Sequence, residues 1–292
     1  MENNNNLVSI IINVHNGEKY IEKCVQSAIN QSYKNIEIII WNNYSTDNTE
    51  SIIKNFDDNR IKYFLSDKFE KLYAARNNAI QVSNGDFITF LDCDDSLLRE
   101  SISTRVRNIL KNKSDVCFAN LYISKNFKTK KTFYSNGIIP KNLKDLIFNY
   151  NICFLSLLFK KEVFEKQKFN ENFNIIGDYD LVLKIFDNYK VSYENTHVGI
   201  YNIHINNFSN RNLEMHSLEL RKWFINNYIV LLDNDKMLKT PIILKYLTLI
   251  NLNKLIKNNY YYLFKYLINS KKNTTFLKVL KSYFNYKFLS IV

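Results

Sequence analysis

The sequence predicts an α/β fold with a mostly parallel central sheet and helices on both faces of that sheet. Two apolar runs rich in β-branched residues, 7–14 and 36–41, have the length of strands that are buried on both faces. A helical pattern separates them, and the same alternation then repeats along the chain. Polar residues follow these runs directly, at the positions where folds of this kind bind ligands.

Each element is predicted from a local pattern. The apolar side chains of segment 18–30 recur on one helical face, and Thr46 or Asp47 can cap the helix that follows the second strand. In chain order we expect a strand at 7–14, a helix at 18–30, a strand at 36–41, a helix carrying Ile52, Ile53 and Phe56, a strand at 61–65, a helix at 72–82, a strand at 87–91, a helix from after 96 to about 111, a strand at 116–123, a loop or hairpin up to 140, a strand at 152–159, a helix at 178–189, a strand at 198–203 and helices beyond 211.

The composition allows a packed globular protein. Of the 292 residues, 46% are hydrophobic and 15% aromatic, which is ample material for a core. No stretch approaches the roughly 20 uninterrupted apolar residues of a spanning helix, and the first residues lack the pattern of a signal peptide. We therefore expect a cytoplasmic protein that does not span a membrane. Four scattered cysteines without metal-ligand spacing predict buried free thiols in a reducing compartment: Cys24, Cys93, Cys117 and Cys153.

Three carboxylates, Asp92, Asp94 and Asp95, come directly after the apolar run 87–91. Carboxylates this close repel one another, so a cation or a ring of donors must offset their charge. A hard divalent ion, which is also bound by phosphates, fits this need. The structural alternative is that Asp94 or Asp95 caps the helix expected after residue 96. Capping explains one of the three carboxylates and leaves the others unexplained.

An ordered set of motifs resembles family 2 glycosyltransferases of the GT-A fold. The motifs are VSIIINVHNGEKYIEKCVQSAINQSYKNIEIIIWNNYSTDNT, AARNNAI, GDFITFLDCDD and GDYDL, and together they cover roughly residues 7 to 205. The resemblance implies a catalytic domain at 1–210, with a donor-binding half at 1–98 and an acceptor-binding half at 99–210. A helical extension at 211–292 would follow it.

The resemblance also implies roles for the polar residues. Asp92 would contact the ribose or the sugar, and Asp94 would ligate Mn²⁺ or Mg²⁺ bridging the diphosphate, with Asp95 and His204 as further candidate ligands. A nucleoside diphosphate-sugar, with uridine favoured, would be bound by Val14, His15, Asn16, Asn43, Tyr44, Arg76, Asp92 and Cys93.

Transfer also requires a base that takes the proton from the acceptor hydroxyl. The segment GDYDL resembles the family segment that supplies it, which implies Asp178 as the base and Asp180 as the fallback. Asp178 could instead cap its helix, and His204 could be a structural histidine. The resemblance implies an inverting enzyme. The expected reaction is therefore a single displacement that transfers the sugar to a glycan or lipid-linked acceptor, as in the synthesis of lipopolysaccharide or capsule.

The chain departs from the family pattern at two places. It has NNYSTD at 42–47 where the family usually has DDGSTD, so Asn43 would meet the base with an amide that can both accept and donate. It also has Asn13 in place of the usual proline and His15 in place of the usual tyrosine. These changes alter the wall of the nucleotide pocket and remove no catalytic group.

The net charge of +12 is concentrated at the end of the sequence. Residues 236–292 hold 11 lysines and no acidic residue, interleaved with aromatic side chains. Such helices can lie on an anionic membrane surface, which would make the protein peripheral on the inner face of the cytoplasmic membrane. The alternative is that the apolar positions pack on the catalytic domain and the lysines are solvated.

Three other classes of protein compete with this interpretation. A nucleic-acid-binding protein would use the basic tail but leaves the carboxylates unexplained, and no nucleic acid is expected as a partner. A nucleotidyltransferase would present a glycine-rich phosphate loop, which the sequence lacks. A non-catalytic binder of nucleotide-sugars would keep the donor residues and lose turnover.

Overall fold

In the computed structural model the chain divides into two compact units, Met1–Asn207 and Phe208–Val292. The structure describes residues 6–133, 146, 150, 152–212, 215, 216, 218–220, 222 and 223. The second unit begins with the short helix α8 (Phe208–Arg211). Most of the predicted extension 211–292, with the basic segment 236–292, lies outside the described residues, so its helical character stays a prediction.

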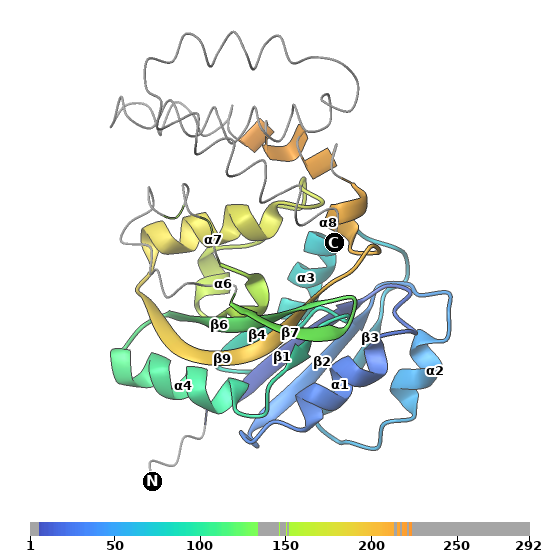
Figure 1. The fold of residues 1–292 in the computed structure, drawn as a ribbon, viewed down its shortest axis with the longest axis horizontal. Coiled ribbons are helices and arrows are strands. Elements are labelled where there is room, and N and C mark those ends of the chain that lie inside the picture. Colours follow the sequence, from blue (N-terminus) through green and yellow to red (C-terminus); the bar gives the residue numbers. More distant parts are fainter. Residues whose placement is uncertain are drawn as a thin grey trace, which may run out of the picture. The chain divides into compact units, whose positions relative to one another are not determined.

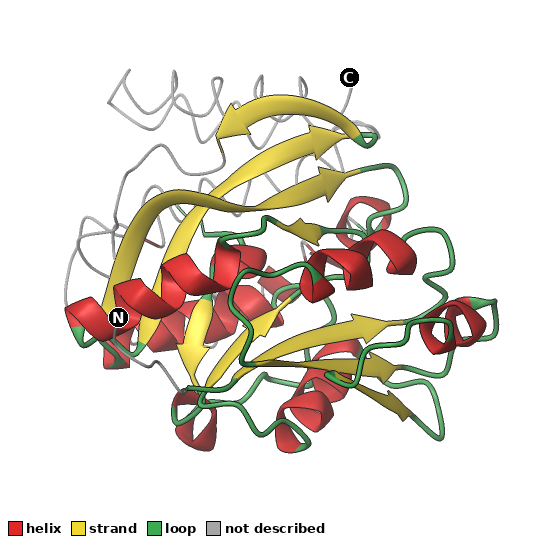
Figure 2. Cartoon of the chain, turned by 90° about the horizontal axis from the view of Figure 1, so that it is seen from below, coloured by secondary structure: helices red, strands yellow, loops and turns green. Residues whose placement is uncertain are grey.

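The described part of the first unit is built on one twisted sheet of nine strands, whose curvature is visible in Figure 2. Four strands at one end are parallel, as the alternation of strands and helices predicts, and antiparallel strands extend them into a mixed sheet. The order is β3 (Ile61–Leu65), β2 (Ile36–Asn42), β1 (Val8–Val14), β4 (Phe87–Phe90), β8 (Leu158–Lys160), β6 (Val116–Lys125), β9 (Val191–Ile203) and β5 (Ser96–Leu97), with β7 (Lys128–Phe133) paired to β6.

Helices cover both faces of the sheet (Figure 1). On one face lie α1 (Ile21–Ile29), α2 (Thr49–Lys54) and α4 (Ser101–Asn112), and on the other lie α3 (Leu72–Gln81), α6 (Val163–Lys166) and α7 (Gly177–Asn188). The period of two along β1 explains the first core, because alternate residues pack with the buried face of α1. These residues are Val8, Ile10, Ile12 and Val14 of β1 with Ile21, Cys24, Val25 and Ala28 of α1.

The second core is aromatic. The Phe90 ring, at the end of β4, lies 5.0 Å from the Phe154 ring and 5.6 Å from the Phe169 ring. Phe154 belongs to a 3-10 helix, η1 (Phe154–Ser156), which replaces the first part of the strand predicted at 152–159. The segment turns there because the backbone N–H and the hydroxyl of Ser156 both donate to the Cys153 carbonyl. Only β8 remains extended.

Three other predicted boundaries are wrong. The helix predicted from 18 begins at Ile21, because the N–H groups of Tyr20 and Ile21 both turn back to the Gly17 carbonyl. The helix predicted after 96 begins at Ser101, since the short strand β5 precedes it. The strand predicted at 198–203 begins at Val191, and its polar first half pairs in parallel with β6.

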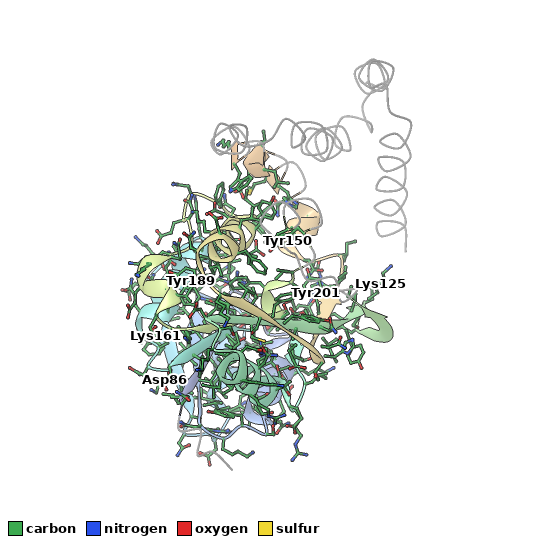
Figure 3. All side chains as sticks on the ribbon, turned by 90° about the vertical axis from the view of Figure 1, so that its left-hand side faces the viewer. Asp86, Lys125, Tyr150, Lys161, Tyr189 and Tyr201 are labelled. Carbon is green, nitrogen blue, oxygen red and sulfur yellow. The ribbon has the colours of Figure 1, made fainter. Side chains whose placement is uncertain are left out.

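The amino-terminal edge of the parallel strands is closed by local polar contacts. The Asp86 carbonyl, just before β4, accepts the N–H of Lys161 at 2.9 Å, and the Asp86 carboxylate accepts the N–H of Leu7 at 2.8 Å. Asp86 and Lys161 lie together in Figure 3, on the opposite side of that view from Lys125. The polar loops that follow the parallel strands lie at the opposite, carboxyl edge of the sheet, where α/β folds bind ligands.

A fully buried arginine joins the two cores. The Arg105 guanidinium, on α4, donates to the Thr89 hydroxyl at 3.1 Å, to the Leu157 carbonyl at 2.8 Å and to the Ser101 hydroxyl at 2.8 Å. Burial lowers the pKa of Arg105 to about 10, so the side chain is still charged at neutral pH. This charge fixes α4 against β4 and against the segment that carries Phe154.

Replacing Arg105 by leucine is expected to lower the free energy of unfolding by roughly 2–5 kcal/mol, because buried carbonyls and hydroxyls lose their donor. Urea denaturation measures the effect. Arg107→Leu, at an exposed position of the same helix, is the matched control and is expected to change little. Equal losses in the two variants would contradict the assigned role of Arg105.

Candidate functional site

The loops that follow β1, β2 and β4 meet at the carboxyl edge of the sheet. The N–H of Asn43 donates to the Val14 carbonyl at 2.7 Å, and the N–H of Leu91 donates to the Ile11 carbonyl at 2.9 Å, so the three strands stay in register to their ends. Parallel strands place their carboxyl ends at one edge, which is where such folds bind ligands. The predicted donor residues and the carboxylates are brought together here.

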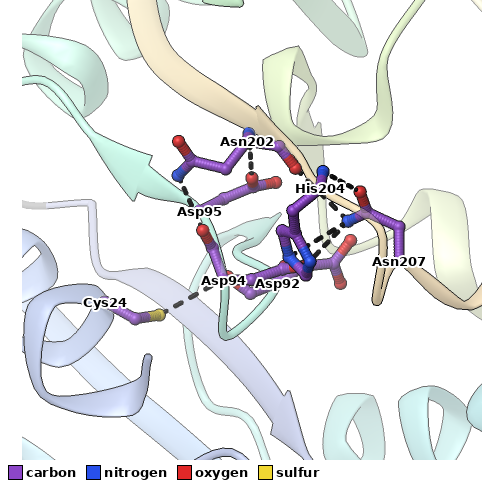
Figure 4. A network of polar contacts seen from close by, with 7 residues as sticks. All are labelled: Cys24, Asp92, Asp94, Asp95, Asn202, His204 and Asn207. Carbon is purple, nitrogen blue, oxygen red and sulfur yellow. Dashed lines mark hydrogen bonds and ion pairs between the residues drawn. The ribbon is translucent and has the colours of Figure 1, made fainter. Parts of the chain in front are cut away.

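Figure 4 shows that the loop with Asp92, Asp94 and Asp95, here called the carboxylate loop, is hydrogen-bonded to the end of β9. Asp94 Oδ2 lies 2.9 Å from His204 Nε2 and accepts the Asn207 amide at 3.0 Å. Asp95 Oδ1 accepts the N–H of Asn202 at 2.7 Å, and the Asn202 amide donates to the Asp94 carbonyl at 2.7 Å. The predicted metal ligands Asp94, Asp95 and His204 are therefore neighbours, although His204 follows Asp94 by 110 residues in the sequence.

The carboxylate loop is short of positive charge. Burial, followed by repulsion from Asp94 and Asp92, holds the pKa of Asp95 well above its usual range. Burial and repulsion from Asp92 also raise the pKa of Asp94, although His204 acts in the opposite direction. The buried Asp95 Oδ2 has no hydrogen-bond partner among the described residues. A cation bound at this loop would relieve both the repulsion and the missing partner.

Helix capping does not account for these carboxylates. Helix α4 begins at Ser101, its N-cap residue is Glu100, and the side chain that accepts an N–H of its first turn is that of Gln31, from Ile102 at 3.2 Å. Asp94 and Asp95 are bound to the end of β9 instead. The capping alternative for this loop is therefore wrong.

Arg76 of α3 lies within an aromatic cage beside the carboxylate loop. Its guanidinium carbon is 5.0 to 5.7 Å from the centres of four rings, and its Nη2 atom is 2.6 Å from Asp92 Oδ1. The Arg76 side chain is only 3% exposed, whereas that of Asp92 is 46% exposed, so the carboxylate can still reach a ligand. Burial opposes the charge of Arg76, but Asp92 and other negative neighbours raise its pKa, and the guanidinium stays charged. The four rings are those of Tyr73, Phe90, Phe154 and Phe169.

Asp178 lies in the first turn of α7, and the charge of Arg76 acts on both Asp178 and Asp92. Its Oδ1 atom accepts the N–H of Tyr179 at 2.8 Å and lies 3.3 Å from the Tyr73 hydroxyl, which donates to the Ile175 carbonyl at 2.6 Å. Burial raises the pKa of Asp178, and Arg76 acts in the opposite direction. A carboxylate with a raised pKa is a better proton acceptor near neutral pH.

Gly177 allows α7 to approach Tyr73. A Cβ atom at this position would lie 2.6 Å from the Tyr73 ring, so any other residue would push the helix away.

The other candidate base, Asp180, is buried and paired with Lys184 at 2.7 Å on the same helix. Of the two carboxylates, Asp178 is the one in contact with the Arg76 region.

The loops that carry the predicted nucleotide-binding residues are held by hydrogen bonds. His15 Nδ1 lies 2.9 Å from the Asn43 carbonyl, and the Asn16 side chain accepts the N–H of Thr46 at 2.8 Å. Both polar atoms of the Asn43 amide bond to the backbone of Glu70, at 3.0 and 2.8 Å. In this state the Asn43 amide therefore fixes the loop around Glu70, and its role at a base stays a prediction.

The remaining predicted donor residues lie around these loops. Tyr44 is exposed and has a positive φ of 59°, while Val14 is buried at the end of β1. Cys93 is partly buried beside Gly17, since a Cβ atom on that glycine would lie 3.5 Å from the Cys93 sulfur. The four cysteines are free, as predicted.

Sequence reasoning missed Asn202, Asn207 and Tyr73, which hold the carboxylates in place. Asn207 has its own signal in principle, because it follows His204 by three residues and closes a turn with it. Asparagine is so common in this chain that neither Asn202 nor Asn207 stands out. In the sequence, Tyr73 occupies an ordinary core position of a predicted helix. Its hydroxyl contacts are with residues about 100 positions later, Ile175 and Asp178, which no local pattern indicates.

Comparisons with known proteins show the family of this chain. The family model described as "Glycosyl transferase family 2" matches residues 9–173. A GalNAc(5)-diNAcBac-PP-undecaprenol beta-1,3-glucosyltransferase of Campylobacter jejuni is 35% identical over 173 residues, which is 57% of this chain and 55% of that protein. The UDP-Glc:alpha-D-GlcNAc-diphosphoundecaprenol beta-1,3-glucosyltransferase WfaP of Escherichia coli is 39% identical over 129 residues, 44% of this chain and 51% of that protein. The chain thus spans about half the length of these relatives.

A solved structure shares the fold. S. aureus TarS 1–349 in complex with UDP aligns with a TM-score of 0.64 and 16% identity, covering 87% of this chain and 75% of that chain. Identity this low supports the GT-A fold alone. The family model, in contrast, covers more than half of the sequence and includes the donor loops, Arg76 and the carboxylate loop. The chain therefore belongs to glycosyl transferase family 2.

Proposed function

We propose that this protein transfers a sugar, with inversion, from a nucleoside diphosphate-sugar to a hydroxyl group of a lipid-linked glycan, in a metal-dependent reaction. The observation that carries the proposal is the Asp94–His204 pair, held at the carboxyl edge beside the donor loops. Arg76 adds a buried positive charge that acts on both Asp92 and Asp178. One edge of the sheet thus holds groups for the donor diphosphate and a base for the acceptor.

The residues present fit a divalent ion. Asp94 Oδ2 and His204 Nε2 are 2.9 Å apart, close to the roughly 3 Å between adjacent ligands of an octahedral ion with bonds near 2.1 Å. Among the described residues, no three His, Cys, Asp or Glu side chains form a complete metal site. Mg²⁺ and Mn²⁺ commonly take one or two protein ligands together with phosphate oxygens, so donor binding would complete the set. When bound, the ion would stabilise the charge of the departing diphosphate.

Asp178 would accept the proton of the acceptor hydroxyl while the anomeric carbon is attacked. Its raised pKa and its place in the first turn of α7 support this role, whereas Asp180 is already paired with Lys184. Asp92, half exposed and bonded to Arg76, would hold the ribose or the sugar. No covalent intermediate is required.

The relatives support the substrate classes. The names of two of them describe transfer to undecaprenol-linked diphosphate acceptors, one of them from UDP-Glc, and the aligned TarS structure holds UDP. We therefore propose a UDP-sugar donor and a lipid-linked acceptor for this chain, in the synthesis of a surface polysaccharide.

No helix among the described residues is long and apolar enough to cross a membrane. A cytoplasmic enzyme that meets its acceptor at the membrane surface, through residues 236–292, remains part of the proposal.

Asp94→Asn is expected to abolish Mn²⁺-dependent binding of UDP and to raise the melting temperature of the metal-free protein at neutral pH. The pKa of Asp94 is raised in the fold, so its ionised form destabilises the protein above that pKa, and the amide removes this charge. The stability gain should shrink as the pH falls and Asp94 becomes protonated. Calorimetric titration with UDP, with and without Mn²⁺, and thermal unfolding in EDTA measure both effects.

The matched control is Asp57→Asn, at an exposed position away from this loop. It should leave both UDP binding and melting temperature unchanged. Metal-independent binding of UDP by Asp94→Asn at wild-type affinity would rule out the proposed metal site.

Asp178→Asn is expected to reduce sugar transfer by at least about 100-fold, since general-base catalysis contributes roughly 10² to 10⁴. UDP binding should stay within about twofold of wild type, because Asp178 acts on the acceptor. Asp187→Asn, exposed on the same helix, is the control. If the wild-type protein binds UDP-sugars and turns none of them over, the non-catalytic binder becomes the better description.

The rate of sugar transfer should fall as the pH is lowered, because the base must be deprotonated. The fall should occur above the ordinary aspartate pKa of about 3.9, because burial raises the pKa of Asp178. Tyr73→Phe removes a donor that lowers this pKa, so the acid limb should move to higher pH. A pH profile of kcat/KM for both proteins measures the shift. A limb that stays in place, or moves to lower pH, would argue against Asp178 as the titrating base.

A further inference from the structure

The turn between β6 and β7 holds a residue that the turn geometry disfavours. Lys125 and Lys128 pair across the two strands, which leaves Asn126 and Phe127 as a two-residue loop. Both loop residues have positive φ angles, 48° for Asn126 and 60° for Phe127. Turns of this kind favour asparagine first and glycine second, because a Cβ atom is unfavourable at positive φ. Asn126 fits the rule and Phe127 breaks it.

The Phe127 ring is stacked on a residue of the site. Its centre lies 5.3 Å from the His204 ring, with the two planes 25° apart, and 5.3 Å from the Tyr20 ring, with planes 20° apart. The rings of Tyr20 and His204 are 5.1 Å apart, so the three rings contact one another. They come from the residue before α1, the β6–β7 turn and the end of β9. Figure 3 labels Lys125, which directly precedes this turn, at the outer end of β6.

The stack orients the imidazole toward the carboxylate loop. The rings of Tyr20 and Phe127 both pack against the His204 ring and also against each other, so they limit the space into which the imidazole can turn, and its Nε2 atom lies 2.9 Å from Asp94 Oδ2. A backbone anchor acts on the same residue, because the N–H of His204 donates to the Asn207 side chain at 2.6 Å. The ring contacts and the backbone contact together set the direction of Nε2.

The fold alone gives no reason for a phenylalanine in this turn. The Phe127 side chain is 45% exposed, so it adds little to the core, and glycine would relieve the positive φ. Unfavourable backbone conformations persist where the surroundings require them, often at functional sites. We propose that Phe127, together with Tyr20, is a positioning residue that holds His204 toward Asp94 for the donor diphosphate and its metal ion. This inference rests on the proposed function of the Asp94–His204 pair.

The test is Phe127→Gly in the full chain, because it separates stability from function. Its melting temperature should equal or exceed that of wild type, while the affinity for Mn²⁺ in the presence of UDP, measured by calorimetry, should fall about tenfold. Sugar transfer should fall by at least the same factor. Phe127→Tyr keeps an aromatic ring and should retain both the Mn²⁺ affinity and the rate of sugar transfer. Asn126→Gly, in the same turn but outside the stack, should behave like wild type.

A second readout is independent of the enzyme's activity. The imidazole resonances of His204, identified among the four histidines by the variant His204→Gln, report on the contact with Asp94 in NMR spectra of the metal-free protein. They should shift or broaden in Phe127→Gly and stay near wild type in Phe127→Tyr. If wild type neither binds UDP nor transfers sugar, the proposed function fails, and these spectra still decide the positioning role.

Two results would overturn the proposal. One is wild-type Mn²⁺ affinity and unchanged His204 resonances in Phe127→Gly. The other is a melting temperature that falls in step with activity in Phe127→Gly, which would make Phe127 a support of the fold.

Discussion

A single buried positive charge organises this site. Arg76 is held among four aromatic rings that come from α3, β4, η1 and the segment before α7, so these elements must be in place together before the guanidinium is enclosed. Isolating a guanidinium from water is costly unless it is paired, and here Asp92 supplies the direct partner. The charge also acts on Asp178, in the first turn of α7. The same charge thus links the carboxylate loop and the first turn of α7 through one helix, α3.

The carboxylate loop reflects the opposite problem, an excess of negative charge. Asp94 and Asp95 are held by β9, a strand that reaches the site because it runs parallel to β6 along its whole length. Their raised pKa values mean that the fold, without a ligand, is strained by their ionisation. A cation bound at this loop would offset the negative charge, and the relief of the repulsion would favour the bound state. If the proposed function holds, stability and binding are opposed at this loop, as they often are at binding sites.

The sequence was sufficient for the fold class and the family, and for most of the elements, because the strands β1, β2 and β4 are continuous apolar runs whose length and β-branched content leave little choice. It failed where tertiary pairing overrides local pattern. The polar first half of β9 is a strand only because β6 lies beside it, and the segment before β8 turns because Ser156 bonds to Cys153. The candidate carboxylates could be named from their clustering. Their partners Asn202 and Asn207 could not, because asparagine is so common in this chain that neither position stands out.

Local rules are broken at this one edge of the sheet more than once. Asn16, Tyr44 and Phe127 have positive φ angles without being glycine, and each of them lies beside a predicted donor residue or the His204 ring. A fold selected for stability alone would place glycine at Tyr44 and Phe127, since their exposed side chains add little burial. Unfavourable backbone and unfavourable charge therefore coincide at the same place, from loops that are remote in sequence. That coincidence is expected when the loops are shaped by a ligand, because only binding compensates for conformations and charges that the free protein disfavours.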